Sequence, residues 1–236
     1  MATNQKVAVI TGASQGIGAA LVKAFRDRNY LVVANSRSIQ ASTDDGVLAV
    51  PGDIGDRAVA ERIISQGIAR FGRIDTLVNN AGIFIAKPFT QYTEQDFQSL
   101  LSTNVAGFFF VTQHAVKQMV VQGAGHVVQI TASIVDQPIN GVPAVLASIT
   151  KGGLNAATKG LAIEYAGRGI RVNAVAPGII KTPMHAAETH EALAGLHPVA
   201  RMGEISDIVD AVLFLEKAGF VTGETLHVDG GQAAGH

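Results

Sequence analysis

The chain has 236 residues and a formal net charge of −1 at pH 7, with 47% hydrophobic residues, 26 glycines and no cysteine. This composition suits one α/β domain with a large buried core. It excludes a disordered chain, a disulfide-stabilised scaffold and a thiolate metal site. A charge this close to zero gives no electrostatic support for a nucleic-acid partner. We therefore expect a single domain over residues 1–236, with no metal.

Two segments bear on where the protein resides. Residues 1–6 lack the long apolar core of a signal peptide. The apolar run at 108–111 is interrupted at once by polar residues at 112–114, so it is too short to span a membrane. We expect a cytoplasmic protein that does not enter membranes.

Short β-rich runs alternate with helix-length amphipathic segments along the chain. Strands are predicted at 7–10, 31–34, 47–50, 76–78, 126–130, 171–175 and 225–228. Helices are predicted near 16–28, 56–70, 94–121, 144–166 and 204–216. Apolar strands separated by helices indicate a Rossmann-type doubly wound parallel sheet of about seven strands with helices on both faces. In such a fold the ligand binds at the carboxyl ends of the strands.

Residues 182–203 do not fit this alternation. The segment contains three histidines and two prolines, and we interpret it as an insertion that folds over the carboxyl ends of the strands as a substrate lid. Its apolar positions suggest a largely apolar pocket for a small-molecule substrate. These positions are Met184, Ala186, Leu193 and Leu196.

The first strand runs directly into a glycine-rich stretch, Thr11–Gly18. Gly12 permits a tight turn, and the later glycines let the backbone approach a ligand closely. The free N–H groups at the start of the next helix then face an anion such as a pyrophosphate, although glycines also occur in such turns for steric reasons alone. The residues expected to contact a nucleotide here are Gly12, Ser14, Gln15, Gly16, Ile17 and Gly18.

The second strand ends in Asn35, Ser36 and Arg37, at the position where a dinucleotide fold meets the adenosine ribose. An acidic residue here would select a free 2′-hydroxyl, but no Asp or Glu occurs between Asp27 and Asp44. Arg37 suits a 2′-phosphate instead. We therefore favour NADP over NAD; the alternative is an ordinary solvated loop arginine.

Polar side chains also follow the third and fourth strands. Asp53, beside Ile54, would either accept a hydrogen bond from an adenine amino group or cap the helix beginning near Asp56. The segment Asn79–Gly82 supplies side-chain amides and a backbone that a ligand can approach closely, although by itself it would also fit an ordinary turn. We expect Asn80, Ala81 and Gly82 to contact the cofactor.

Together these segments resemble the short-chain dehydrogenase/reductase family over essentially the whole chain. The matching motifs are Thr11-Gly12-x-x-x-Gly16-x-Gly18, Asn79-Asn80-Ala81-Gly82, Thr103-Asn104-Val105, Pro177-Gly178 followed by Thr182, and Gly223-Glu224 with Val228-Asp229-Gly230-Gly231. The resemblance implies a Rossmann-type fold, a nicotinamide cofactor and hydride exchange between a carbonyl and an alcohol. It also implies a homotetramer or dimer built partly through the helices near 94–121 and 144–166.

The same resemblance places four further residues against the cofactor, namely Pro177, Gly178, Ile180 and Thr182. Thr182 is expected to touch the nicotinamide carboxamide or a phosphate. Its alternative role is as the N-cap of a helix in the lid.

The family resemblance further implies a catalytic set of Asn, Ser, Tyr and Lys, with Tyr four residues before Lys on one helix face. It assigns Lys151 to the nicotinamide ribose and Asn104 to a water molecule beside it. Four residues before Lys151 stands Ala147, and no tyrosine occurs between Tyr92 and Tyr165. The family's general acid is therefore expected to be missing.

The serine position is irregular as well. Counted along the strand, the family serine falls on Ala132, and Ser133 is the next residue. A bulge at the strand end would let Ser133 take the role, which we assign to it. The alternatives are a capping role for Ser133, a backbone-satisfying role for Asn104 and a surface position for Lys151.

Two functions remain open on these residues. The first is an NADP-dependent reductase of ketones or imines with an atypical proton source, such as Ser148, a lid histidine (His185, His190 or His197), or a water held by Ser133 and Lys151 in the space beside Ala147. An iminium substrate would need no donor, because it already carries its proton. The second is a catalytically weak or inactive dinucleotide-binding member of the family that acts as a sensor or a structural subunit.

Overall fold

The computed structural model describes residues 5–235. Its centre is one parallel sheet of seven strands in the order β3-β2-β1-β4-β5-β6-β7. This arrangement confirms the predicted doubly wound sheet, and the order reverses between β1 and β4, where such folds bind ligands. The strands are β1 (Val7–Thr11), β2 (Leu31–Ser36), β3 (Val47–Pro51), β4 (Thr76–Asn79), β5 (Gly125–Ile130), β6 (Ile170–Pro177) and β7 (Thr225–Val228).

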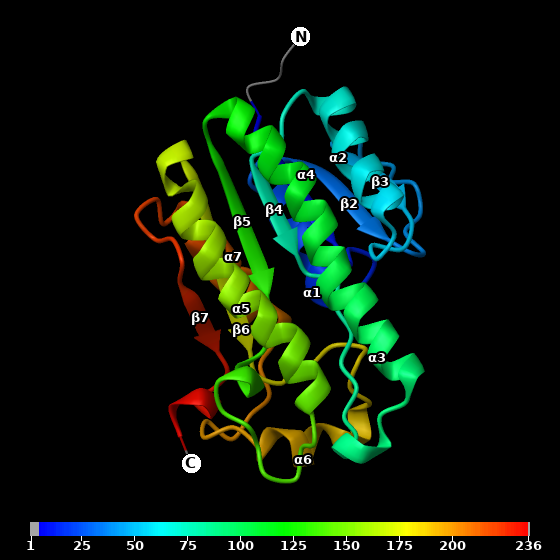
Figure 1. Cartoon of the computed structure of the whole chain (residues 1–236), viewed down its shortest axis with the longest axis vertical. Coiled ribbons are helices and arrows are strands. Elements are labelled where there is room, and N and C mark those ends of the chain that lie inside the picture. Colours follow the sequence, from blue (N-terminus) through cyan, green and yellow to red (C-terminus); the bar gives the residue numbers. More distant parts are fainter. Residues whose placement is uncertain (1–4, 236) are drawn as a thin grey trace.

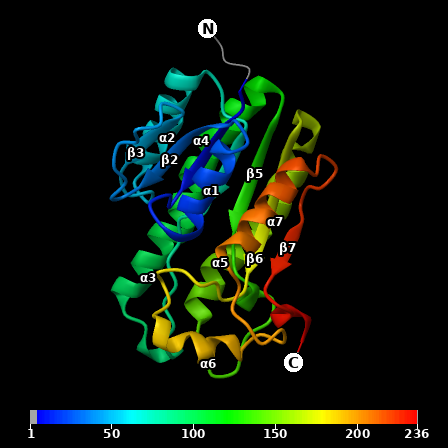
Figure 2. The same ribbon diagram turned by 180° about the vertical axis from the view of Figure 1, so that it is seen from behind.

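Helices cover both faces of the sheet. In Figure 1, α2, α4 and α5 lie in front of it, and Figure 2 shows α1 and α7 on the opposite face. All the strands run toward the end of the molecule where α6 lies (Figure 1). The helices are α1 (Gly16–Arg26), α2 (Arg57–Phe71), α3 (Glu94–Leu100), α4 (Gly107–Gln122), α5 (Val145–Tyr165), α6 (His190–Ala194) and α7 (Ile205–Lys217).

The sheet separates two apolar cores. Because successive strand residues point to opposite faces, Val7 and Val9 of β1 pack into the core under α2 and α4. Ala8 and Ile10 pack into the core under α1 and α7. The strands are therefore apolar on both faces, which is why they appear in the sequence as unbroken hydrophobic runs.

The helix predicted over 94–121 is interrupted. Residues Leu101–Ala106 form a wider π-helical turn between α3 and α4. At its end Gly107 lies against Ile54, and a Cβ on Gly107 would come within 2.8 Å of the Ile54 side chain. The turn contains Asn104, and π-helical turns are frequent at functional sites.

A buried polar network lies at the other end of the sheet, around Glu216 of α7. The Glu216 carboxylate accepts hydrogen bonds from Tyr30 (2.8 Å), Thr76 (2.9 Å) and Nδ1 of His126 (2.8 Å). The other ring nitrogen of His126 lies 3.2 Å from the amide of Asn173. The network thus connects α7 to the central strands β4, β5 and β6.

Residues 182–203 leave and rejoin the fold at one point. Ile180 pairs with Gly203 in a short parallel bridge, and the Lys181 and Gly203 N–H groups each donate a 2.9 Å hydrogen bond across it. The segment carries α6 and lies past the carboxyl ends of the strands (Figure 1). Within residues 5–235, no helix has both the length and the apolar character that crossing a membrane requires.

Candidate active site

A cavity of about 850 Å³ runs along the carboxyl ends of the strands, from Arg37 at one end to Leu196 of segment 182–203 at the other. It is lined by nearly all of the residues predicted to bind a cofactor or act on a substrate. Within the predicted cofactor-binding and catalytic set, Gly18 and Asn104 are the described residues that do not line the cavity. Gly18 lies against Gly12 and Asn80, and Asn104 lies against Gly82, so both are directly behind its wall. Ala186, predicted in the apolar substrate pocket, and Ser148, a candidate proton donor, do not line it either.

The glycine turn is held in place by Asn80. Its side-chain amide donates to the carbonyl oxygens of Thr11 (2.9 Å) and Gly12 (3.2 Å). Gly12 has a φ of +66°, which favours glycine, and a Cβ on it would lie 2.9 Å from the Ala81 backbone. A Cβ on Gly18 would overlap the Gly12 carbonyl oxygen. The Asn80 side chain therefore shapes the turn, and close packing explains why Gly18 must be glycine.

The Arg37 end of the cavity contains one unsatisfied polar atom. The Ser36 hydroxyl is buried and has no hydrogen-bond partner among the described residues, although Ser36 lines the cavity beside Arg37. Asn35 also lines this end. Its side-chain amide donates to the carbonyl oxygens of Val50 (2.9 Å) and Gly52 (3.2 Å) and so stabilises the end of β3. An unpaired buried hydroxyl on a residue that lines a cavity is consistent with a site that a ligand or water completes.

Asp53 and Asp56 have different roles. The Asp53 carboxylate accepts from the Gly55 N–H at 3.0 Å and closes a turn beside the cavity. Asp56 is the N-cap of α2, because its carboxylate accepts from the Ala58 N–H at 2.8 Å. The alternative in which Asp53 caps this helix is therefore wrong.

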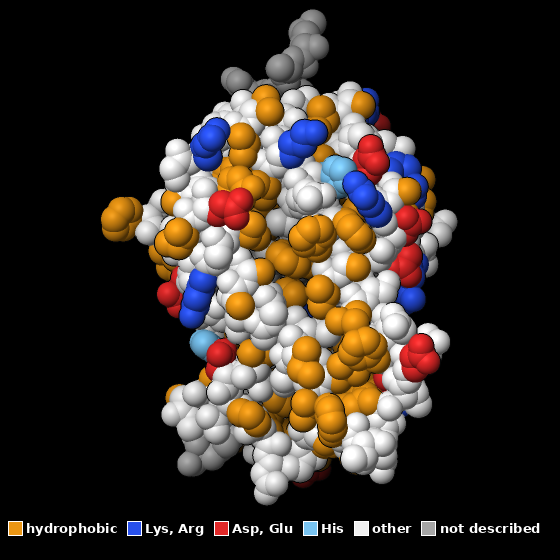
Figure 3. Space-filling model, in the orientation of Figure 1, with side chains coloured by type: hydrophobic (Ala, Val, Ile, Leu, Met, Phe, Trp, Pro, Cys, Tyr) orange, Lys and Arg blue, Asp and Glu red, His pale blue; other side chains and the backbone are white. Residues whose placement is uncertain are grey.

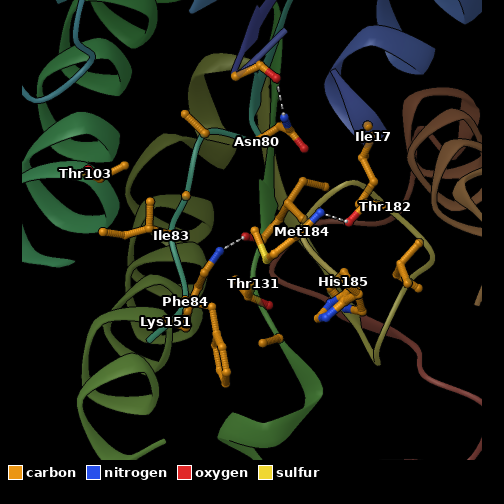
Figure 4. A pocket seen from close by; sticks show the side chains of 18 of the residues that line it. Ile17, Asn80, Ile83, Phe84, Thr103, Thr131, Lys151, Thr182, Met184 and His185 are labelled. Atoms are coloured by element: carbon orange, nitrogen blue, oxygen red, sulfur yellow. Dashed lines mark hydrogen bonds between the residues drawn. The ribbon is translucent and has the colours of Figure 1, made fainter. Parts of the chain in front are cut away.

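Lys151 projects from α5 into the centre of the cavity (Figure 4). Its ammonium donates a 2.7 Å hydrogen bond to the carbonyl oxygen of Ile130, at the end of β5. A Cβ on Gly82 would lie 3.0 Å from Nζ, so a larger residue there would press on the lysine ammonium. Burial of the ammonium lowers the pKa of Lys151 to about 8. Lys151 is thus a cavity residue, and the alternative of a surface lysine is wrong.

Asn104 stabilises the loop and the helix that lie behind Lys151. Its Oδ1 accepts from the Ile83 N–H at 2.9 Å, and its amide donates to the Ile83 carbonyl oxygen at 3.0 Å and to the Thr150 hydroxyl at 3.1 Å. Both amide protons are therefore used. Asn104 ties the π-helical turn to the loop after β4 and to α5, one residue before Lys151, and so positions Lys151.

Ala147 lies in a small apolar cluster one turn before Lys151. The cluster, which we call the Ala147 cluster, consists of Ala132, Ile134, Ile139, Val142, Ala144 and Ala147. Ala147 is only 1% exposed and does not line the cavity. The expected space for a water molecule at Ala147 is therefore wrong, because the neighbouring apolar side chains fill it.

Ser133 does line the cavity, but its hydroxyl donates to the side-chain oxygen of Gln232. It does not cap the short helical turn that it begins, so the capping alternative is wrong. The sequence missed Gln232, which lines the cavity from the C-terminal segment. The two residues are 99 positions apart, so no local pattern connects them.

The three histidines of segment 182–203 differ in their surroundings. His197 is buried, and its Nε2 accepts a hydrogen bond from the Ile179 N–H at 2.9 Å. Nδ1 therefore carries the proton and donates to the carbonyl oxygen of Leu193 at 3.1 Å. His190 lies 3.3 Å from the carbonyl oxygen of His185. His185 lines the cavity opposite Lys151 (Figure 4), and burial, with the nearby charge of His190, lowers the pKa of His185. Only His185 of the three histidines faces the cavity.

Thr182 lies beside the glycine turn, where a Cβ on Gly16 would be 3.6 Å from its side chain. It lines the cavity, and its hydroxyl accepts from the Met184 N–H at 3.4 Å. The helix of this segment, α6, begins at His190 and has Thr189 at its N-cap position. The alternative in which Thr182 caps this helix is therefore wrong.

Known proteins are similar to this chain along almost its full length. Residues 12–233 match the family model described as enoyl-(acyl carrier protein) reductase. The 3-oxoacyl-(acyl-carrier-protein) reductase FabG of Escherichia coli is 34% identical over 242 residues, covering 96% of each chain. The hydroxy(phenyl)methylsuccinyl-CoA dehydrogenase subunit BbsD of Thauera aromatica is 34% identical over 247 residues, covering 99% of this chain and 98% of the relative.

Solved structures are also similar to this chain along almost its full length. ElxO with NADP bound superposes with a TM-score of 0.91 at 31% identity, covering 98% of this chain and all of the other. A 3-ketoacyl-(acyl-carrier-protein) reductase from Brucella melitensis in complex with NADH superposes with a TM-score of 0.90 at 29% identity, covering 97% and 98%. The glycine turn, the Asn80 side chain that holds it and Lys151 all lie in the part of the chain that these sequences and folds match. The chain therefore belongs to the short-chain dehydrogenase/reductase family.

Proposed function

We propose that this protein is an NADPH-dependent reductase of small, largely apolar ketones or imines. The observation that carries the proposal is the continuity of one cavity from the Arg37 end, past the glycine turn, to Lys151 and segment 182–203. Its far end is mostly apolar and includes Ile83, Phe84 and Leu193. Such a lining favours an uncharged substrate.

The described residues fit a dinucleotide. The glycine turn at the start of α1 offers backbone N–H groups to a pyrophosphate, and side chains at Gly12 or Gly18 would block it. Ser36 supplies an unpaired hydroxyl beside Arg37, which suits a ribose 2′-phosphate. We assign Lys151, which lines the cavity, to the nicotinamide ribose. When bound, the reduced cofactor supplies the hydride; related structures with NADP or NADH bound support this assignment.

The residues around Lys151 organise the reacting end. Asn104 fixes the loop at Ile83 and the start of α5, which holds the ammonium against the cavity. The apolar side chains of Phe84 and Met184 line the cavity near Lys151 (Figure 4). A desolvated positive charge at this position stabilises negative charge that develops on a carbonyl oxygen during reduction.

The experiment that tests this function measures NADPH consumption with matched panels of ketones and cyclic imines. We expect turnover with at least one apolar member of either panel. NADPH binding without turnover would instead support the catalytically weak, dinucleotide-binding alternative, which is favoured because no tyrosine is among the described residues that line the cavity. Failure to bind either NADPH or NADH would overturn both.

We expect Arg37→Gln to weaken NADPH binding by about 10- to 100-fold and to leave NADH binding unchanged, because a hydrogen bond to a charged group contributes about 1.5–3 kcal/mol. Titration of both cofactors with intrinsic or cofactor fluorescence measures the two affinities. Arg28→Gln, at an exposed position beyond the end of α1, is the matched control. Tighter binding of NADH than of NADPH by the unmodified protein would contradict the assignment of Arg37.

We also propose that the outer face of α4 and α5 binds a second copy of this chain, in a dimer or tetramer. Hydrophobic side chains gather on this face (Figure 3). They include Phe109 on α4, which is 53% exposed, and Ile149 and Ile163 on α5, which are 56% and 84% exposed. An apolar patch on two neighbouring helices is typical of an interaction surface.

We expect the double variant Phe109→Glu/Ile149→Glu to have a lower molar mass in solution than the unmodified protein, because association would bury two carboxylates without partners. Size-exclusion chromatography with light scattering measures the mass. Gln66→Glu on α2 adds charge at an exposed position outside this patch and is expected to leave the mass unchanged. A monomeric unmodified protein would contradict the proposal.

A further inference from the structure

Ketone reduction requires a proton as well as a hydride, and few groups at the reacting end of the cavity are able to release one. The hydroxyls of Thr131 and Ser133 line this end, but they donate to the Val175 carbonyl oxygen (3.3 Å) and to Gln232. A serine or threonine hydroxyl is also a very weak acid unless another group replaces its proton at once. Ala147 contributes only a buried methyl group to the Ala147 cluster.

Two titratable side chains remain among the described residues at this end, Lys151 on α5 and His185 on segment 182–203. Burial and the nearby His190 lower the pKa of His185, so its ring is mainly neutral near pH 7. Neither ring nitrogen of a neutral imidazole at that position would be a strong acid. His185 is therefore the weaker candidate.

The surroundings of Lys151 favour loss of a proton. One N–H of its ammonium is used by the Ile130 carbonyl oxygen, which leaves two for other partners. Gly82, Asn104, Thr150 and the end of β5 pack around the ammonium group. His185 lies across the cavity from it. Among residues 5–235, no carboxylate forms an ion pair with Lys151.

We propose that Lys151 itself is the proton donor of this site, either directly or across one water molecule, in addition to holding the cofactor ribose. The proposal rests on the proposed function. It gives this chain a source of protons although no tyrosine accompanies the lysine. The lowered pKa of Lys151, about 8, is consistent with this role because it lies near the operating pH.

Ketone reduction then transfers one hydride and one proton. The carbonyl carbon accepts hydride from the reduced dinucleotide, and the electron pair of the C=O π bond moves to the oxygen. That oxygen takes a proton as an N–H bond of the Lys151 ammonium breaks. The products are the alcohol, the oxidised dinucleotide and a neutral amine, which then regains a proton from solvent. An N-alkylated iminium accepts hydride at carbon and requires no proton.

This difference between substrates provides the test. We expect the unmodified protein to reduce an apolar cyclic ketone at a rate that is constant at low pH and falls as the pH rises through about 8, because the donor must be protonated. Reduction of an N-methylated cyclic iminium salt is expected to show no such fall. The fall for the ketone is expected to persist in His185→Gln.

Lys151→Arg keeps a positive charge and N–H donors but does not release a proton in this pH range. We expect it to lower ketone reduction by about 10²- to 10⁴-fold beyond any loss that it causes in NADPH binding and iminium reduction, which depend on Lys151 only through the position of the cofactor. Equal loss with both substrates would show that Lys151 only positions the cofactor, and would overturn the proposal. So would a ketone rate that does not change through pH 8, or an unmodified protein that reduces only the iminium. Reduction of neither substrate would instead overturn the proposed function.

Discussion

Gly18→Ala is expected to lower NADPH affinity by about 10- to 100-fold, because overpacking at a closely packed position costs about 1–3 kcal/mol. The added methyl would overlap the carbonyl oxygen of Gly12, which is backbone and is held by the Asn80 amide. The turn would have to open, and its N–H groups would no longer converge on a pyrophosphate. Isothermal titration of the purified variant with NADPH measures the loss.

The matched control is Gly219→Ala in the loop after α7, where an added Cβ meets nothing within 4 Å. This variant is expected to keep its stability and to bind NADPH normally. Thermal unfolding without cofactor separates loss of binding from loss of folding. A Gly18→Ala protein that folds and binds NADPH with unchanged affinity would show that the turn is not the phosphate site.

The second large effect is expected at Glu216, far from the cavity. Burial alone would raise the pKa of Glu216, but hydrogen bonds from His126, Tyr30 and Thr76 outweigh it and lower the pKa to about 2. Burial also lowers the pKa of His126, so we assign the pair as a carboxylate that accepts the Nδ1 proton of a neutral imidazole. In Glu216→Gln an amide group would face these donors, and several of them would lose their acceptor.

We expect Glu216→Gln to reduce the free energy of unfolding by about 3 kcal/mol at pH 7, or Tm by roughly 6–12 °C. A folded-state pKa below the usual value of 4.5 stabilises the fold above that pH, and this contribution is lost as the pH falls from 4.5 toward 2. The difference between the two proteins should therefore shrink over that range. Urea unfolding at pH 3 to 7 measures it, with the exposed Glu61→Gln as control. A difference that does not depend on pH would contradict the assigned ionisation.

The sequence predicted those parts of the fold that depend on local patterns. The apolar strands and the helices between them gave the doubly wound sheet, because each strand is buried on both faces. The glycine turn and the Asn79–Gly82 segment were placed correctly at the carboxyl ends of two neighbouring strands. Their side-chain roles were less predictable: Asn35 and Asn80 line the cavity, but their amides hold backbone carbonyl oxygens.

Other features depend on contacts between distant residues. The π-helical turn at Asn104 interrupts a continuous helical pattern, and Gly107 at its end packs closely on Ile54. The bond from Ser133 to Gln232 joins segments that share no local motif. The filling of the space around Ala147 likewise depends on Ile139 and Val142, which come from the preceding loop. No periodicity in the sequence specifies these contacts.

The short bridge between Ile180 and Gly203 has a practical consequence for engineering. Because the two ends of segment 182–203 are joined there, both ends are fixed at one place on the fold. His197 adds a second attachment inside it, through the Ile179 N–H. Exchanging residues 184–200 for the matching loop of a relative is expected to change the lining near Leu193 and Leu196, while Thr182 beside the glycine turn and the sheet stay as they are.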